Sequence, residues 1–125
     1  MSPKADSPEQ SMPPVAWRSH CAVSCALDLL GDKWSLLIIR DLIIHESRTY
    51  SEFRESPEHI STNILANRLK LLSCLGVIRR VNPEGSSRGN AYELSEKGLA
   101  LKPVVQAYGE WALEHLKEFN DKLTR

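Results

Sequence analysis

The chain has 125 residues, of which 42% are hydrophobic, 16 are basic and 16 are acidic, so its formal net charge is zero. This length supports one domain with a modest core. A neutral chain is not a general polyanion binder, so any basic surface must be local. The longest apolar run, at residues 36–39, is too short to cross a bilayer, and no secretion signal opens the chain. We therefore expect no membrane partner and a cytoplasmic, nucleoid-associated location.

The amino-terminal residues 1–16 are predicted to form a disordered or loosely ordered tail. Residues 1–15 contain four prolines and three serines with little apolar content. Trp17 is the first residue expected to pack. Residues 17–125 are therefore predicted to form the folded domain.

Two helices are predicted next. In residues 19–31 the apolar positions trace one helical face, and Gly31 can end that helix. Asp32 is well placed to cap a second helix at residues 33–45. The inward face of this second helix is predicted from its apolar spacing to comprise Trp34, Leu37, Ile38 and Leu42, widened by Ile39, Ile43 and Ile44. It is the best candidate for the central element of the core.

A loop at residues 46–48 leads to a short third helix that stops before Pro57. Thr49 and Glu52 have the spacing of a capping box, and Phe53 is expected to face inward. A further helix follows from Ser61 to Leu75. Two helices joined by a tight turn, the second with a polar outer face, are typical of a helix-turn-helix.

The helix at residues 61–75 is the candidate DNA-reading element. Its inward face carries Ile64, Leu65, Leu69 and Leu72, and its outer face carries Asn63, Ala66, Asn67 and Lys70. An amide side chain can pair with adenine, and lysine can reach guanine or phosphate in the major groove. From residue 61 to residue 82 there are four cations, Arg68, Lys70, Arg79 and Arg80, and no acid. An ordinary polar surface helix is the competing interpretation.

A β-hairpin is predicted directly after this helix. Gly76 can end the helix, residues 77–81 alternate as a strand, and residues 91–94 form the returning strand. The polar loop at residues 83–90 holds Arg88, which can reach a minor groove or a phosphate. The fold class is therefore mainly α with a small hairpin wing, a winged helix-turn-helix. The alternative to a DNA-contacting wing is an ordinary polar hairpin tip.

The last segment, residues 95–123, is predicted to be helical, with bends or a break at Gly98, Pro103 and Gly109. Large apolar side chains recur along it at spacings of three and four, including Tyr108 and Trp111. Little of the chain is left for this face to pack on, which favours a subunit interface over a cover for the core.

Several blocks of the sequence resemble the HxlR-type winged-helix regulators, which are relatives of the MarR group. The blocks are CAVSCALDLLGDKWSLLIIRDL, RTYSEF, HISTNILANRLKLLSCLGVIRR, AYELSEKGLALKPVV and GEW, and together they span residues 21–111. The resemblance implies a bacterial transcription regulator that binds a palindromic operator in double-stranded DNA as a homodimer. It also implies dimer contacts through the first and last helices, which would include Trp17, Tyr108 and Trp111. Where the family usually has Gly-Gly-Lys-Trp, this chain has Gly-Asp-Lys-Trp at residues 31–34.

The resemblance also implies roles for individual residues in DNA binding. Ser61 and Thr62 would contact phosphate at the amino end of the reading helix, and Asn63, Asn67 and Lys70 would face base edges. Arg48 would lie near the DNA backbone, and Arg80 and Arg88 would belong to the wing.

Cys21 aligns with a cysteine that senses quinones, aldehydes or oxidants in part of the family. A thiol near a helix amino end, beside His20, gains thiolate character. Cys25 lies one turn on, and such a pair seldom reaches disulfide geometry, so a bridge to the other subunit is favoured over a Cys21–Cys25 bridge. The family usually has proline after this cysteine; Ala22 stands here instead, which can extend the helix and bury the thiol. Cys74 is expected to be a small core residue.

Neither a metal or cofactor site nor a catalytic constellation is predicted. His20, Cys21 and Cys25 lack a fourth ligand at a suitable spacing, and no phosphate-binding loop or nucleophile motif is present. Two other functions remain open. The signal can be a small molecule lodged between Trp17, Trp34, Tyr108 and Trp111, or the winged helix can be a protein-interaction module without a DNA role.

Overall fold

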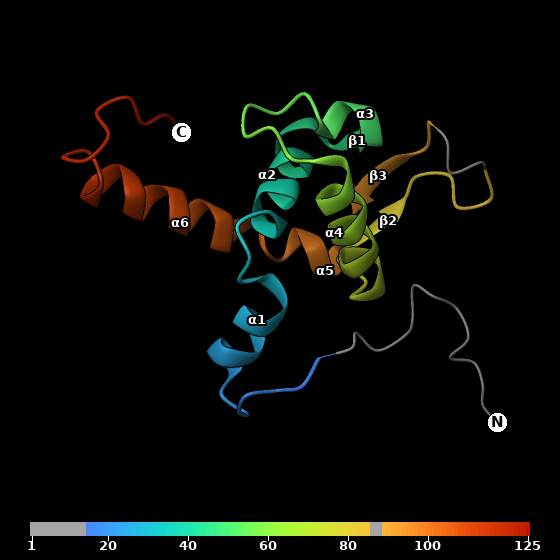
Figure 1. The fold of residues 1–125 in the computed structure, drawn as a ribbon, viewed down its shortest axis with the longest axis horizontal. Coiled ribbons are helices and arrows are strands. Elements are labelled where there is room, and N and C mark those ends of the chain that lie inside the picture. The colour runs from blue at the N-terminus through green and yellow to red at the C-terminus, as the bar shows by residue number, and fades with distance from the viewer. Residues whose placement is uncertain (1–14, 86–88) are drawn as a thin grey trace.

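The computed structural model describes residues 15–85 and 89–125 and contains helices packed around a small sheet (Figure 1). In chain order the elements are α1 (Ala22–Leu30), α2 (Ser35–His45), β1 (Ser47–Thr49), α3 (Tyr50–Phe53), α4 (Thr62–Cys74), β2 (Ile78–Arg80), β3 (Ala91–Leu94), α5 (Glu96–Leu99) and α6 (Lys102–His115). The predicted fold class, mainly α with a hairpin wing, is confirmed. Most of the predicted tail, and Arg88, lie outside the described residues.

The core forms where α2, α3, α4 and the hairpin meet. Its buried side chains come from all of these elements: Ile38, Ile39, Leu42, Phe53, Ile60, Leu65, Leu69, Leu72, Val77, Ile78 and Leu94. The prediction that α2 is central is confirmed, because Ile38, Ile39 and Leu42 are all buried. Two inward assignments were wrong: Ile44 is 62% exposed and Ile64 is 38% exposed. Both lie beside the inward stripe of their helix, where no other element covers them.

The sheet has three antiparallel strands in the order β1-β3-β2. β2 pairs with β3 through Ile78↔Leu94 and Arg80↔Tyr92, as the predicted hairpin requires. β1 pairs with the other edge of β3, with Arg48 opposite Tyr92. The sequence had indicated a loop at residues 46–48, which was wrong for Ser47 and Arg48. A three-residue strand shows no readable alternation, and its pairing is with residues more than forty positions away.

Local signals placed the helix ends well. The Thr49 hydroxyl accepts from the Glu52 backbone N–H, and the Glu52 carboxylate accepts from the Thr49 N–H, which completes the predicted capping box. Asp32 accepts from the backbone N–H groups of Trp34 and Ser35 at 2.9 and 3.0 Å, so it caps the start of α2 as predicted. Gly76 ends α4 with φ of 75°.

Helices α1 and α6 project from the body formed by the other elements (Figure 1). The carboxy-terminal segment was predicted to be helical to residue 123, with bends or a break at Gly98, Pro103 and Gly109, and a break is confirmed. The structure breaks it between α5 and α6 and ends it at His115, so residues 116–123 were wrongly predicted as helix. Within the described residues no helix is long and apolar enough to cross a membrane.

Candidate nucleic-acid interface

The amino end of α4 is capped by a hydroxyl side chain and carries no acid. Ser61 is the N-cap, and its side chain accepts from the backbone N–H of Ile64. No acidic residue lies in the first turn, so the partial positive charge of the helix terminus is not neutralised there. Thr62 is exposed beside Ser61.

One face of α4 is fixed in the core and the opposite face is open to solvent. Leu65, Leu69 and Leu72 are buried. The predicted outer face is exposed, and it consists of Asn63, Ala66, Asn67 and Lys70. This face presents amides and one ammonium group with no carboxylate among them, which are groups suited to base edges and phosphates.

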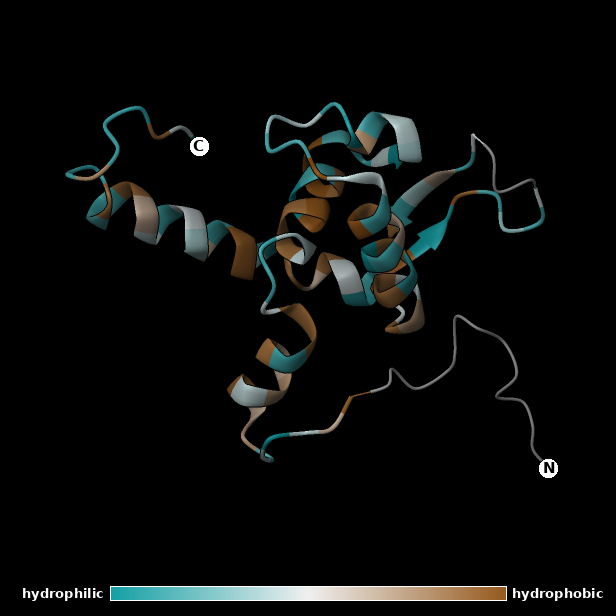
Figure 2. Ribbon diagram, viewed as in Figure 1, coloured by the Kyte–Doolittle hydropathy of each residue, from teal (hydrophilic) through white to brown (hydrophobic). Residues whose placement is uncertain are grey.

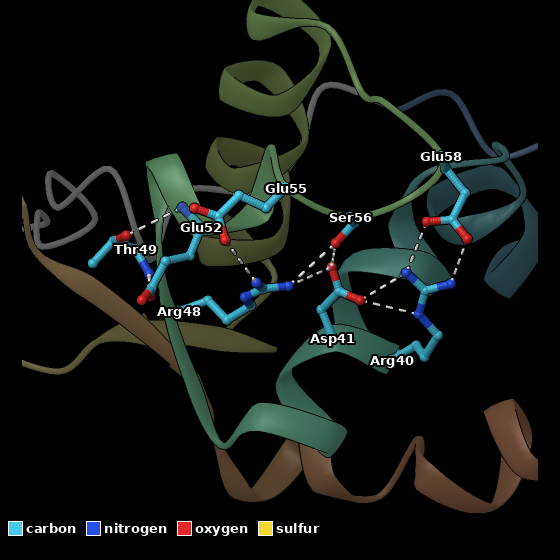
Figure 3. Close-up of polar contacts among 8 residues, drawn as sticks. All are labelled: Arg40, Asp41, Arg48, Thr49, Glu52, Glu55, Ser56 and Glu58. Carbon is cyan, nitrogen blue, oxygen red and sulfur yellow. Dashed lines mark hydrogen bonds and ion pairs between the residues drawn. The ribbon is translucent and has the colours of Figure 1, made fainter.

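A network of polar side chains holds the turn between α3 and α4 against α2 (Figure 3). Asp41 is buried, and its carboxylate accepts from the Ser56 hydroxyl and from the Arg40 guanidinium. Arg40 also donates to both oxygens of Glu58, at 2.7 and 2.9 Å. The residues that lead into α4 are therefore tied to the central helix.

A second tie joins the two helices of the helix-turn-helix directly. The Tyr50 hydroxyl on α3 donates to the backbone carbonyl of Thr62 at 2.9 Å. Sequence reasoning missed this contact, because no local pattern connects residues twelve positions apart.

The structure gives Arg48 partners within the chain. Its guanidinium lies 3.6 Å from the Asp41 carboxylate and donates to the Ser56 hydroxyl at 3.2 Å, and the side chain is only 12% exposed. These contacts support a structural role in the turn that precedes α4. The phosphate contact assigned to Arg48 from the resemblance stays a prediction.

Folding changes the charge balance that the sequence showed between residues 61 and 82. Arg68 pairs with Asp32 at 3.2 Å, and Arg79 pairs across the hairpin with Glu93 at 2.9 Å. Arg80 donates to the carbonyl of Pro83. Acids from distant positions therefore partly neutralise the cations of this region, and Lys70 is exposed on the outer face.

A groove of about 880 Å³ separates α4 from the wing. Its walls combine cations with aromatic rings, including Lys70, Arg80, Tyr50 and Tyr92. Basic and aromatic groups facing one channel are suited to a phosphodiester backbone.

Asn90 closes the base of the wing loop. Its amide nitrogen donates to the carbonyl of Asn82 at 2.6 Å, its oxygen accepts from the Asn82 N–H at 3.3 Å, and the side chain is buried. Sequence reasoning did not single out Asn90. The only available signal was an amide immediately before the returning strand, a position typical of turns.

The projecting helices carry large apolar side chains in the open. Val23 and Leu27 on α1 are 68% and 53% exposed, and Tyr108 and Trp111 on α6 are 64% and 55% exposed. Figure 2 shows apolar residues on both of these helices. Trp17, expected to pack, is also exposed within the chain. Exposed apolar surface of this kind marks an interaction site.

Within the described residues, none of the three cysteines forms a disulfide. Cys21 is the N-cap residue of α1 and is exposed, so the expectation that Ala22 would extend the helix and bury this thiol was wrong. The Cys25 thiol donates to the carbonyl of Ser19 at 3.3 Å. Cys74 is half-buried at the end of α4.

Comparison with known proteins decides the family. The profile of the HxlR-like helix-turn-helix family matches residues 29–120. The chain belongs to this family. This HxlR-like protein is accordingly a helix-turn-helix transcriptional regulator, and its relatives carry that description.

Two relatives from Bacillus subtilis illustrate the similarity. The regulator YvaP is 37% identical over 90 residues, which cover 71% of this chain and 82% of YvaP. The regulator YodB is 40% identical over 88 residues, which cover 70% of this chain and 77% of YodB.

Solved structures agree with this HxlR-like assignment. The reduced form of YodB has a TM-score of 0.61 at 34% identity, with 78% of this chain and 95% of that chain covered. YodB has also been solved bound to a quinone. The redox regulator HypR in its reduced form has a TM-score of 0.67 at 25% identity, with 81% of this chain and 99% of that chain covered.

Proposed function

We propose that this HxlR-like protein represses transcription by occupying a pseudo-palindromic operator as a homodimer. The observation that carries the proposal is the outer face of α4, where Asn63, Asn67 and Lys70 are exposed with no acid beside them. These residues would contact base edges, and Ser61 and Thr62 would contact phosphate at the helix terminus.

The wing would contribute contacts that do not depend on base sequence. Arg80 borders the groove between α4 and the wing, and Arg88 follows it in the sequence between β2 and β3. Neutralising phosphates releases counterions, so these residues would set the affinity and its dependence on salt.

The exposed faces of α1 and α6 support the homodimer. Val23, Leu27, Tyr108 and Trp111 leave more apolar surface in water than a monomer of this size favours. A second copy related by a twofold axis would cover them and would place two α4 helices in successive major grooves.

Base readout and phosphate contact are separated by two substitutions. Asn67→Ala should weaken binding by about 1–3 kcal/mol at selected base positions, whereas Arg88→Ala should weaken binding to all sequences alike and flatten the salt slope. The measurement is the affinity of each variant for DNA fragments from the source genome at several salt concentrations. Binding that neither substitution alters would contradict the assignment of α4 and the wing.

The dimer is tested by placing a charge on the exposed apolar faces. Leu27→Asp and Trp111→Asp should each shift sedimentation from dimer towards monomer. Ile44→Asp is the matched control, because Ile44 is equally exposed but lies on α2. Equal effects of all three substitutions, or none, would contradict a dimer through α1 and α6.

The thiol at Cys21 supports a redox or electrophile signal. It is exposed at the amino end of α1, and the similar protein YodB has been solved bound to a quinone. With diamide, two thiols would lose two electrons and two protons to the diazene, which becomes the hydrazine, and a disulfide between subunits would form. Cys21→Ser should abolish release from the operator by diamide, and a response that persists in this variant would contradict Cys21 as the sensor and favour a small-molecule signal.

A further inference from the structure

The Arg68 guanidinium holds the side chain of Asn67, the residue proposed to read bases. Its Nε and Nη2 both donate to the Asn67 Oδ1, at 3.0 and 2.5 Å. Arginine carries only donors, so the amide atom that faces it must be the oxygen and not the nitrogen. The orientation of the Asn67 amide follows from this chemistry.

The same guanidinium is anchored to the body of the protein. Arg68 Nη1 lies 3.2 Å from the Asp32 carboxylate, and the Arg68 side chain is only 24% exposed. Asp32 is itself fixed at the start of α2, where it accepts from the N–H groups of Trp34 and Ser35. Partial burial acts to raise the pKa of Asp32, but hydrogen bonds from the Ser35 hydroxyl and from these N–H groups, together with the charge of Arg68, hold the pKa below its usual value, so the carboxylate is charged at neutral pH.

The two bonds from Arg68 use the hydrogen-bonding capacity of the Asn67 oxygen. A carbonyl oxygen has two lone pairs, and both are engaged by one guanidinium. Among the described residues the Asn67 amide nitrogen has no hydrogen-bond partner. Asn67 therefore offers donors to a ligand and no free acceptor.

This arrangement changes which base Asn67 can read. The bidentate contact with adenine needs the amide oxygen to accept from N6 while the amide nitrogen donates to N7. Guanine N7 and O6, and thymine O4, require only a donor. We propose that Arg68, anchored by Asp32, is a specificity-determining positioning residue that makes Asn67 a donor-only reader and disfavours adenine at its position. This inference rests on the proposed function, because it assumes that α4 enters the major groove.

The anchor depends on the carboxylate at residue 32, because Asp32 is the acid that the Arg68 guanidinium contacts.

The test is selection of bound duplexes from a random library with the full-length protein and with Arg68→Met, Asp32→Asn and Asn67→Ala. Arg68→Met keeps the apolar stem but removes every donor, and Asp32→Asn keeps acceptor oxygen for the cap but removes the charge. Asn67→Ala should erase the preference at one position per half-site and so identify the base that Asn67 reads.

At that position the wild-type protein should prefer guanine or thymine, and Arg68→Met should raise the relative enrichment of adenine by about tenfold. Asp32→Asn should give an intermediate shift, with the preferences at other positions unchanged in both variants. Unaltered preference in Arg68→Met, or adenine preferred already by the wild type, would overturn the inference while leaving the proposed function intact. Failure of the wild type to enrich any sequence would overturn the proposed function and the inference together.

Discussion

The Asp41 carboxylate on α2 lies 3.6 Å from the Arg48 guanidinium on β1, and the two side chains are 8% and 12% exposed. The same carboxylate accepts from the Ser56 hydroxyl and from the Arg40 guanidinium. One buried acid thus joins the central helix, the first strand and the loop that leads to α4 (Figure 3). The loop that leads to α4 is therefore held against the central helix.

Replacing Asp41 with asparagine should be strongly destabilising. The amide keeps the shape of the side chain but leaves the nearly buried Arg48 with only the exposed Glu55, at 3.9 Å, as a charge partner, so we expect a loss of about 3 kcal/mol in the free energy of unfolding. Urea denaturation measures this loss. The protein concentration must be kept fixed, because dimerisation would make stability depend on concentration. Glu110→Gln is the control: its partner Arg125 is 74% exposed, and the expected loss is below about 1 kcal/mol. Similar losses in both variants would contradict the role of Asp41.

The features that sequence predicted correctly are governed by neighbours along the chain. The Thr49–Glu52 capping box, the helix end at Gly76 and the spacing of the buried Leu65, Leu69 and Leu72 each depend on residues within four positions. Helix capping and helical periodicity act between residues that are close in the chain, so residue type and spacing were sufficient to predict these features.

The features that sequence missed depend on distant pairings. Asp41 was not expected to be buried, Arg48 was expected at DNA and not among acids, and Arg68 was counted as a free cation although Asp32 pairs with it. An ion pair between residues 36 positions apart leaves no periodic trace in the sequence. The electrostatics of the candidate interface therefore required the fold.

The Arg40–Glu58 pair should make part of the stability depend on pH. Hydrogen bonds from Arg40 hold the pKa of Glu58 below its usual value of 4.5, although partial burial acts in the opposite direction. Because the folded-state pKa is the lower one, this stabilisation is fully present above about pH 5 and is lost as the pH falls through the folded-state pKa. The side chain is 34% exposed, so solvent screening limits the contribution to about 1 kcal/mol.

Glu58→Gln isolates this contribution. The variant should be less stable than the wild type at pH 7, and the difference should shrink as the pH falls through the lowered folded-state pKa of Glu58 and disappear below it. Urea denaturation of both proteins across this range is the measurement. A stability difference of the same size at every pH would show that the charge of Glu58 in the Arg40–Glu58 pair is not the source of the pH dependence.

Asn90 should determine how rigidly the wing is held. Asn90→Ala removes both hydrogen bonds to Asn82, which are partly buried, and leaves the N–H and carbonyl of Asn82 without their side-chain partner. We expect a loss of about 1–2 kcal/mol in the free energy of unfolding and faster amide exchange at Val81, which pairs with Ala91 beside the loop. Asn90→Asp keeps an acceptor for the Asn82 N–H but places a second acceptor against the Asn82 carbonyl, so its loss should be at least as large as that of Asn90→Ala. Unchanged exchange at Val81 in Asn90→Ala would contradict this role.

Gly98 marks the closest approach of α5 to the sheet. A Cβ added there would lie 2.2 Å from the carbonyl oxygen of Val77 and 2.9 Å from the Leu94 Cδ2. Val77 and Leu94 are core residues, and the Val77 carbonyl already accepts from the Ser95 N–H, so neither neighbour can move away at low cost. Gly98→Ala should therefore lower the free energy of unfolding by about 1–3 kcal/mol despite the better helix propensity of alanine.

Gly109→Ala is the control with the opposite sign. A Cβ at Gly109 meets nothing within 4 Å, so this substitution should stabilise α6 by about 0.5–1 kcal/mol. Thermal and urea unfolding of both variants check this, and stabilisation by both substitutions would show that α5 can withdraw from the sheet without loss.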